Sequence, residues 1–199
     1  LVPLTQSQLN AIMGFQLDTN TDAIDVDFNQ FEAGAVATSR MSATGAARAA
    51  DLPTYSLGTW YNPTQGTLYA EFLAPAIDTN NIVASLNDGT VANRIEVYPF
   101  AVTSAVLDVA VGSVSQALLV VVAITGGTTA KIAGIYQAND FAGYANGTSL
   151  GTDALGSVPT VTKLVVGARG DGSSNFNGYI RKISYYPIRM NNAIAQSLT

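Results

Sequence analysis

The sequence has 199 residues and a formal net charge of −5, with 48% hydrophobic and only 12% charged residues. A chain of this length can bury one large core without help from a metal ion or a disulfide. It contains no Cys and no His, which excludes disulfides, thiolate metal sites and every Ser-His or Cys-His catalytic pair. The nine basic residues are scattered, so nucleic acid is not an expected partner.

Residues 1–30 differ from the rest of the chain and are predicted to form a lead-in or oligomerisation segment before a single domain over residues 31–199. The segment is too apolar for a free tail, so we expect it to pack on the domain or on another copy. Closed homo-oligomers are the default for symmetric assemblies, and a trimer is the form we favour for a fibre. Its apolar residues are Leu9, Ile12, Met13, Phe15 and Leu17.

From about residue 35 the pattern changes to short strands separated by turns. Asn87-Asp88-Gly89, Gly126-Gly127 and Asn146-Gly147 are hairpin signals. Residues 191–198 are predicted to form one or two helical turns capped by Asn191. The most apolar run, residues 117–124, is far shorter than the roughly 20 residues of a membrane-spanning helix, so no membrane insertion is expected. The predicted strands lie at 36–44, 67–73, 82–86, 94–98, 107–111, 117–125, 129–137, 163–168 and 179–186.

Many short strands with turn signals every 8–12 residues are typical of an all-β sandwich or barrel. No βαβ spacing and no internal repeat is present, which argues against a parallel sheet or a solenoid. In the strand at 179–186, strict alternation predicts one face formed by Tyr179, Ile183 and Tyr185 and another formed by Ile180, Lys182 and Ser184.

The C-terminal half resembles the concanavalin A-like, laminin G-like domains in the order and spacing of four segments over residues 129–199. The resemblance implies an all-β fold made of two antiparallel sheets in a jelly-roll sandwich, with a short N-terminal lead-in and a short C-terminal helix. The segments are Phe141–Gly147, Lys163–Gly167, Phe176–Tyr186 and Met190–Leu198.

A narrower resemblance is to such domains in bacteriophage tail and other virion proteins. It rests on Ala47–Asp51, Trp60–Phe72 and Asn177–Ile183. It implies a non-catalytic module of a tail, fibre or capsid surface, located on the virion surface outside the cell. Its partners would be other virion proteins, copies of itself and host surface glycans. Two alternatives stay open: a structural or decorating protein without a ligand, and a polysaccharide hydrolase.

The candidate sugar-binding residues are aromatic and amide side chains next to turns, where loops present ligand sites. Trp60 and Tyr61 would stack on the apolar face of a sugar ring, although a buried core position for Trp60 is equally compatible with the sequence. Tyr144, Asn146 and Asn175 would add contacts and hydrogen bonds.

No cofactor is expected, but the resemblance allows a Ca²⁺ site at Asp88 and Asp171. Hard cations need six or more oxygen ligands, and Asp residues in turns more often only shape the turn. A hydrolase would need two carboxyl groups about 5 Å apart. The three Glu residues are Glu32, Glu71 and Glu96, and none forms a strand motif of that kind.

Overall fold

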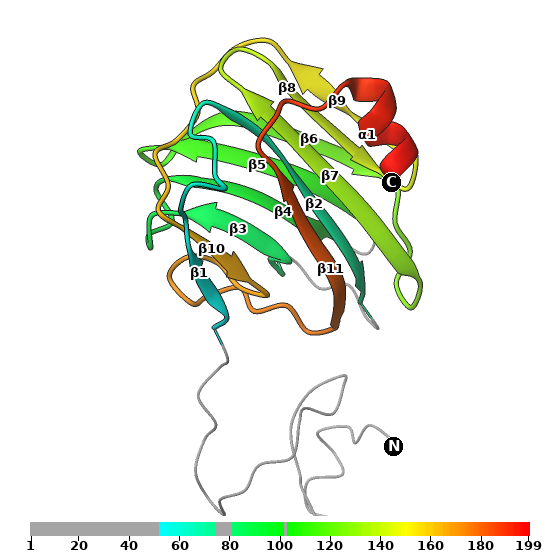
Figure 1. Ribbon diagram of the computed structural model, residues 1–199. Helices are drawn as coiled ribbons and strands as arrows, with labels where there is room; N and C mark the ends of the chain where they lie inside the picture. Colours follow the sequence, from blue (N-terminus) through cyan, green and yellow to red (C-terminus); the bar gives the residue numbers. More distant parts are fainter. Residues whose placement is uncertain (1–51, 75–80, 102) are drawn as a thin grey trace, which may run out of the picture. The chain divides into compact units, whose positions relative to one another are not determined.

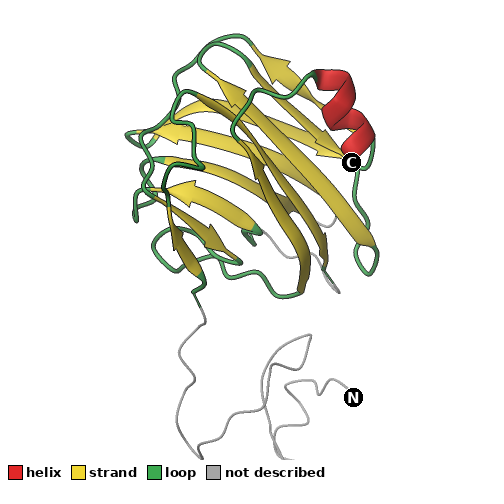
Figure 2. Cartoon of the chain, in the orientation of Figure 1, coloured by secondary structure: helices red, strands yellow, loops and turns green. Residues whose placement is uncertain are grey.

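The computed structural model describes residues 52–74, 81–101 and 103–199, all within the compact unit Ala49–Thr199. They form two sheets, in which every pair of neighbouring strands is antiparallel, and one helix (Figures 1 and 2). The predicted two-sheet sandwich with a short C-terminal helix is therefore confirmed. The predicted strand at 36–44 and the lead-in of residues 1–30 lie outside the described residues.

The six-stranded sheet has the order β1-β10-β3-β4-β5-β6 and the five-stranded sheet the order β11-β2-β7-β8-β9. The first contains β1 (Thr54–Ser56), β10 (Lys163–Val166), β3 (Ala84–Asn87), β4 (Arg94–Phe100), β5 (Ser104–Val111) and β6 (Val114–Val122). The second contains β11 (Tyr179–Tyr186), β2 (Gln65–Leu73), β7 (Thr129–Gln137), β8 (Phe141–Ala145) and β9 (Thr148–Asp153).

Local turn chemistry sets two of the three predicted hairpins, while the one predicted at Gly126-Gly127 is wrong, because this turn leads from β6 to β7 and these strands belong to different sheets. Asn146 and Gly147 have φ values of 45° and 76°, which match the twist of the hairpin between β8 and β9. Gly89, with φ 98°, follows β3 in the turn toward β4. The Oδ1 of Asn87 accepts a hydrogen bond from the Gly89 N–H, which closes this second turn.

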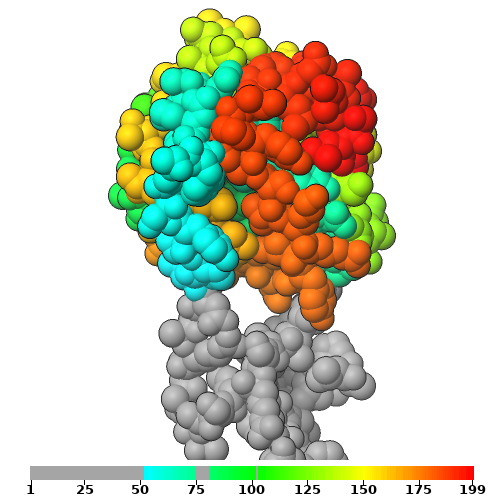
Figure 3. All heavy atoms as spheres, in the orientation of Figure 1, coloured from blue at the N-terminus to red at the C-terminus, as the bar shows by residue number. Residues whose placement is uncertain are grey.

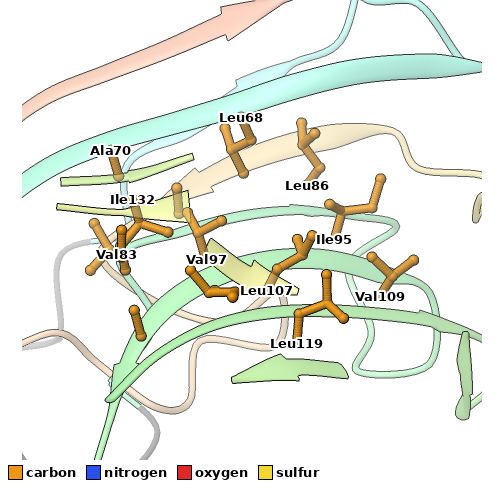
Figure 4. Close-up of a cluster of buried hydrophobic side chains, with 14 of the residues drawn as sticks. Leu68, Ala70, Val83, Leu86, Ile95, Val97, Leu107, Val109, Leu119 and Ile132 are labelled. Atoms are coloured by element: carbon orange, nitrogen blue, oxygen red, sulfur yellow. The ribbon is translucent and has the colours of Figure 1, made fainter. Parts of the chain in front are cut away.

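The core lies between the two sheets, because alternate residues of each strand point inward. Leu68 and Ile132 of the five-stranded sheet face Val97 and Leu107 of the six-stranded sheet, and all four are fully buried (Figure 4). The sheets approach closely at Gly134, where a Cβ atom would lie 2.7 Å from Leu107 Cδ1 and 2.9 Å from Val97 Cγ1. A side chain at this position would push the two layers apart.

A β-bulge in β11 corrects one prediction. The register against β2 shifts between Ile180 and Lys182, so that Ile180 pairs with Phe72 and Ile183 with Ala70. Ile180 therefore lies on the inner face together with Ile183 and Tyr185, and the predicted division of this strand into two alternating faces is wrong. An extra residue in one strand reverses the alternation on either side of it.

The helix α1 (Asn192–Leu198) lies against the outer face of the five-stranded sheet (Figure 2). As predicted, Asn191 caps it: its side chain accepts a hydrogen bond from the N–H of Ala193. Buried Ala195 and Met190 pack there on Tyr144. None of the helices in the described part of the chain is long and apolar enough to cross a membrane.

We predict that Gly134→Ala lowers the free energy of unfolding by about 1–3 kcal/mol, because the added methyl group overpacks the contact with Leu107. Leu107→Ala alone should cost about 2–5 kcal/mol. In the Leu107→Ala background the cost of Gly134→Ala should fall, because one of the two clashing side chains is gone and only Val97 Cγ1, at 2.9 Å, remains. Chemical denaturation of the four proteins measures this coupling. Gly58→Ala, whose Cβ would have no neighbour closer than 3.6 Å, is the control. Strictly additive costs would contradict the proposed close approach.

Candidate functional site

A groove of about 700 Å³ opens between the edge strands of the two sheets, β1 on one side and β11 on the other. On the face seen in Figure 3, the residues around β1 (cyan) lie beside those of β11 (orange). This volume is within the usual range of small-ligand sites, roughly 300–1,000 Å³. The groove walls are formed by Thr54, Tyr55, Ser56, Trp60, Leu164, Val166, Ile180, Arg181, Lys182, Ile183 and Tyr185.

Three aromatic rings give the groove flat apolar surfaces. Tyr55 is 57% exposed and Trp60 is 40% exposed, which leaves their ring faces accessible. The Trp60 ring meets the Tyr185 ring edge to face at 5.4 Å, and its contact with Tyr61 is of the same kind at 6.2 Å. Trp60 is therefore held in place by neighbouring rings while part of it remains open to a ligand.

Hydroxyl groups fix the ring of Tyr185 beneath Trp60. The Tyr185 hydroxyl accepts a hydrogen bond from the N–H of Asn62 at 3.1 Å and lies 3.0 Å from the hydroxyl of Tyr136. Both hydroxyls pack closely against Gly66, where a Cβ atom would lie 2.5 Å from Tyr136 Oη. Burial raises the pKa of Tyr61 to about 12, so this ring stays neutral at physiological pH.

The charged residues of the groove are all cationic. Arg181 lies in the bulge of β11, and Lys182 follows it; both are exposed, but the ammonium of Lys182 lies 5.9 Å from the centre of the Tyr69 ring on the outer face of the sheet. A bulge on an edge strand re-aims a side chain, which explains how Arg181 reaches the groove. No Asp or Glu belongs to the described residues that line it. The groove therefore combines stacking surfaces with positive charge and favours an anionic or polar ligand with an apolar face.

The structure brings together two of the predicted sugar-binding residues. Trp60 and Tyr61 are neighbours at the groove, with Trp60 on its wall and Tyr61 half-buried behind it. Sequence reasoning missed Tyr55, Tyr185 and Arg181. The three exposed residues of β1 show no alternating pattern that could have indicated Tyr55, and the bulge interrupts the alternation of β11.

Tyr144 and Asn146 lie elsewhere. Tyr144 is only 6% exposed, because α1 covers it on the outer face of the five-stranded sheet. Asn146 accepts a hydrogen bond from the N–H of Lys131 and donates one to the carbonyl of Ala123, so its side chain joins neighbouring segments. Lys131, the partner of Asn146, lies near one end of β7. Tyr136, which contacts Tyr185 of the groove, lies near the other end. They are five positions apart along the strand, which corresponds to roughly 17 Å.

Asp88, Asp171 and Asn175 lie in two turns on the other side of the six-stranded sheet. Leu164 points into the core beside the groove, so the preceding Lys163 points outward, where its Nζ donates to the carbonyl of Gly170. The turns containing Asp88 and Asp171 meet this outer side. Asn175, an exposed residue, forms a bridge with Ile82.

The two carboxylates predicted for Ca²⁺ are engaged within their own turns. Asp88 accepts hydrogen bonds from the N–H and hydroxyl of Thr90, and Asp171 does the same with Ser173. These bonds lower the pKa of both Asp residues, which stay ionised. In the described ranges no group of three or more acidic side chains could hold a metal ion. The residues fit turn formation better than a hard-cation site.

Glu71 and Glu96 cannot form the carboxylate pair of a retaining hydrolase. Glu71 stands opposite Lys131 and Lys182 in the strand register, on the outer face of the five-stranded sheet. Glu96 lies on the outer face of the six-stranded sheet, in register with Ser85. Two packed sheets, about 10 Å apart, separate the two side chains, whereas such a pair needs a separation of about 5 Å.

Glu96 is instead the centre of an ionic network that the sequence did not predict. Its carboxylate is fully buried, accepts a hydrogen bond from Ser85 at 3.0 Å and pairs with Arg169 at 3.3 Å. Arg94 lies 3.5 Å from it and pairs with Asp108 at 2.8 Å. Burial raises the pKa of Glu96, against the opposing effect of Arg169. The network holds the loop that contains Arg169 on the outer face of the sheet.

We predict that Arg169→Ala lowers the free energy of unfolding at pH 7 by about 3 kcal/mol, because it leaves a buried carboxylate short of a cation. The pKa of Glu96 is raised in the folded state, so the fold favours the protonated carboxyl group. This contribution to stability is present at low pH and is lost as the pH rises through the raised pKa. The difference between variant and parent should therefore shrink on acidification. Thermal melts from pH 3 to 8 measure it, with exposed Arg181→Ala as the control. A pH-independent loss would contradict this role of Glu96.

Comparison with known proteins gives a likeness of fold. No protein-family model and no curated protein matches the sequence. The CBM40 module of the Ruminococcus gnavus IT-sialidase superposes with a TM-score of 0.60 at 15% identity, over 69% of this chain and 84% of the module. The same module bound to alpha2,3 sialyllactose gives 0.57 at 14% identity, over 69% and 83%. A heptameric SAP-like pentraxin from Limulus polyphemus gives 0.54 at 16% identity, over 74% and 71%.

The chain therefore shares the two-sheet jelly-roll sandwich fold of these proteins. At such low identity the likeness extends to the arrangement of strands and not to individual binding residues.

Proposed function

We propose that this chain is a non-catalytic, glycan-binding module of a bacteriophage virion, exposed on the particle surface. The observation that carries the glycan-binding part is the groove between β1 and β11, with the exposed ring of Trp60 beside Arg181 and Lys182 on a lectin-type fold. The neighbours of this fold include a carbohydrate-binding module that was seen with sialyllactose.

The chemistry of the groove supports an acidic glycan in particular. A sugar ring has an apolar face that can stack on Trp60 or Tyr55, and its hydroxyl groups can bond Thr54 and Ser56 on the opposite wall. The guanidinium of Arg181 matches a carboxylate or sulfate in a bidentate geometry. A neutral glycan would use the rings and leave the guanidinium of Arg181 without a partner.

The non-catalytic part is supported by the residue types and their placement. The sequence has no His and no Cys, and Glu71 and Glu96 lie on opposite outer faces. The virion part is supported by the resemblance of Trp60–Phe72 and Asn177–Ile183 to virion domains. Other virion proteins would then be the neighbours of this module, and host surface glycans its ligands.

We predict that the protein binds acidic glycans on an array and that Trp60→Ala weakens this binding about tenfold or more, because the stacking surface is lost. Trp60 is 40% exposed and contacts two neighbouring rings, so its removal should lower the free energy of unfolding by only about 1–2 kcal/mol. Titration calorimetry with the best array ligand measures the affinity. Tyr179→Ala is the matched control, because Tyr179 is a 64% exposed aromatic residue that does not line the groove.

A second variant, Arg181→Ala, should remove the preference for acidic over neutral glycans and reduce the salt dependence of binding. An array without any bound glycan would favour the alternative, a structural or decorating protein without a ligand. Loss of several kcal/mol of stability in Trp60→Ala would assign that residue to the core and remove it from the site.

The virion location is tested by electron microscopy of purified phage particles from the source of this sequence, labelled with antibodies against the domain. We expect label on the outside of the particle, at the tail, fibre or capsid surface. Label confined to host cell debris would overturn the location and leave the glycan result unaffected.

A further inference from the structure

We infer that two copies of this chain associate through the outer face of β6, across a two-fold axis close to Val120. The inference rests on a stripe of three successive outward-facing residues of this strand, Leu118, Val120 and Val122, which are 57%, 43% and 71% exposed. We call this set, together with Phe100, the β6 stripe. It is independent of the glycan-binding groove.

The strand β6 is apolar on both faces. Its inward residues Ala117 and Leu119 are buried in the core, as expected for one face of a sandwich strand. Its outward residues should then be polar if they faced only water. An edge strand with apolar residues on both faces has the composition of a strand that is covered on both sides.

The stripe is contiguous in space. Val122 pairs with Ser104, and Ser104 pairs with Phe100, which is 36% exposed, so that Phe100 and Val122 belong to one row across the sheet. The row of Val120 contains Val106 and Tyr98, which are buried. Most other exposed apolar residues of the described chain, such as Leu52, Leu155 and Ile188, are scattered singly, as is usual for a protein surface.

The surroundings of the stripe favour a second copy as the partner. A two-fold axis places each residue close to its own counterpart, so a self-association surface cannot carry unbalanced charge. The nine residues of β6 include no charged side chain. Among the described residues, the acidic group in register with the stripe is Asp108, which stands opposite Leu118 and pairs with Arg94 at 2.8 Å. The rim therefore adds no repulsion between copies, although the chain has a net charge of −5.

The rest of this outer face is already covered within the chain. The loop that contains Arg169 lies over Glu96 of β4, and Gly170 lies against Asn87 of β3. On the described part of this face, the stripe on β6 is apolar surface that stays exposed. Its four residues expose on the order of 400 Å², about half of the roughly 800 Å² that each partner buries in a standard interface. They would form the centre, with neutral polar neighbours such as Ser104 at the rim.

Sedimentation equilibrium of the full 199-residue chain tests the proposal. We expect a dimer at micromolar concentration. Val120→Lys should raise its dissociation constant on the order of 100-fold, because the two-fold axis brings two ammonium groups together in an apolar contact. Ile194→Lys is the matched control, because Ile194 is a 58% exposed aliphatic residue on α1, over the opposite sheet, and should leave the dimer unchanged.

Disulfide trapping gives a second readout that does not depend on a disruptive charge. The chain has no Cys, so Val120→Cys introduces a single thiol that should form a covalent dimer under mild oxidation, while Ile194→Cys should not. Circular dichroism checks that each variant is folded, and Val120→Thr replaces Val120→Lys if the lysine prevents folding.

A monomeric parent protein at 100 µM would overturn the proposal. So would an oligomer that Val120→Lys leaves intact, since that oligomer would use another surface. Binding of the parent to neutral phosphatidylcholine vesicles, lost in Val120→Lys, would assign the stripe to a lipid surface and equally overturn the dimer.

Discussion

The close approach of the two sheets at Gly134 is the constraint on which the other features depend. Because Leu107 and Val97 fill the space where a side chain would stand, each strand near this point has one inward face that cannot be changed without separating the layers. The outward faces are then fixed as well. The positions of Glu71 and Glu96 on opposite outer faces, and therefore the absence of a carboxylate pair between them, follow from this packing.

The groove lies where the core reaches the surface at an open edge of the sandwich. Leu164 belongs to the buried cluster, and Ile183 and Tyr185 pack against that cluster from β11, yet all three line the groove. On the opposite side β6 and β9 lie near each other, since Leu119 is in contact distance of the position a Cβ on Gly151 would take. The groove is thus an unfilled end of the core whose exposed apolar surface is partly covered by the ring of Trp60.

The parts of the structure that depend on neighbouring residues in the sequence could be predicted. The hairpin at Asn146-Gly147, the cap at Asn191 and the strands β7 and β11 follow from turn chemistry and alternation. The strand β1 was not predicted, because three exposed residues give no alternating pattern.

The parts that depend on distant residues could not be predicted. The bulge near Arg181 is a property of the pairing between β11 and β2, and the burial of Tyr144 requires α1 to fold back on β8. The contact between Trp60 and Tyr185 joins residues more than 120 positions apart. The site therefore could be predicted only in its local member, Trp60 with Tyr61.

The groove and the β6 stripe occupy opposite edges of one sheet, which has β1 at one end of its order and β6 at the other. Association through β6 would leave both grooves open, at the far edges of the pair. When two linked sites bind a repetitive glycan surface, the first contact holds the second site close to the surface, so the second contact becomes intramolecular. The avidity of the pair rises without any change in the groove. Weak binding by a single open groove is then compatible with firm attachment of an assembly. The apolar stripe of β6 would serve recognition by setting the distance between sites.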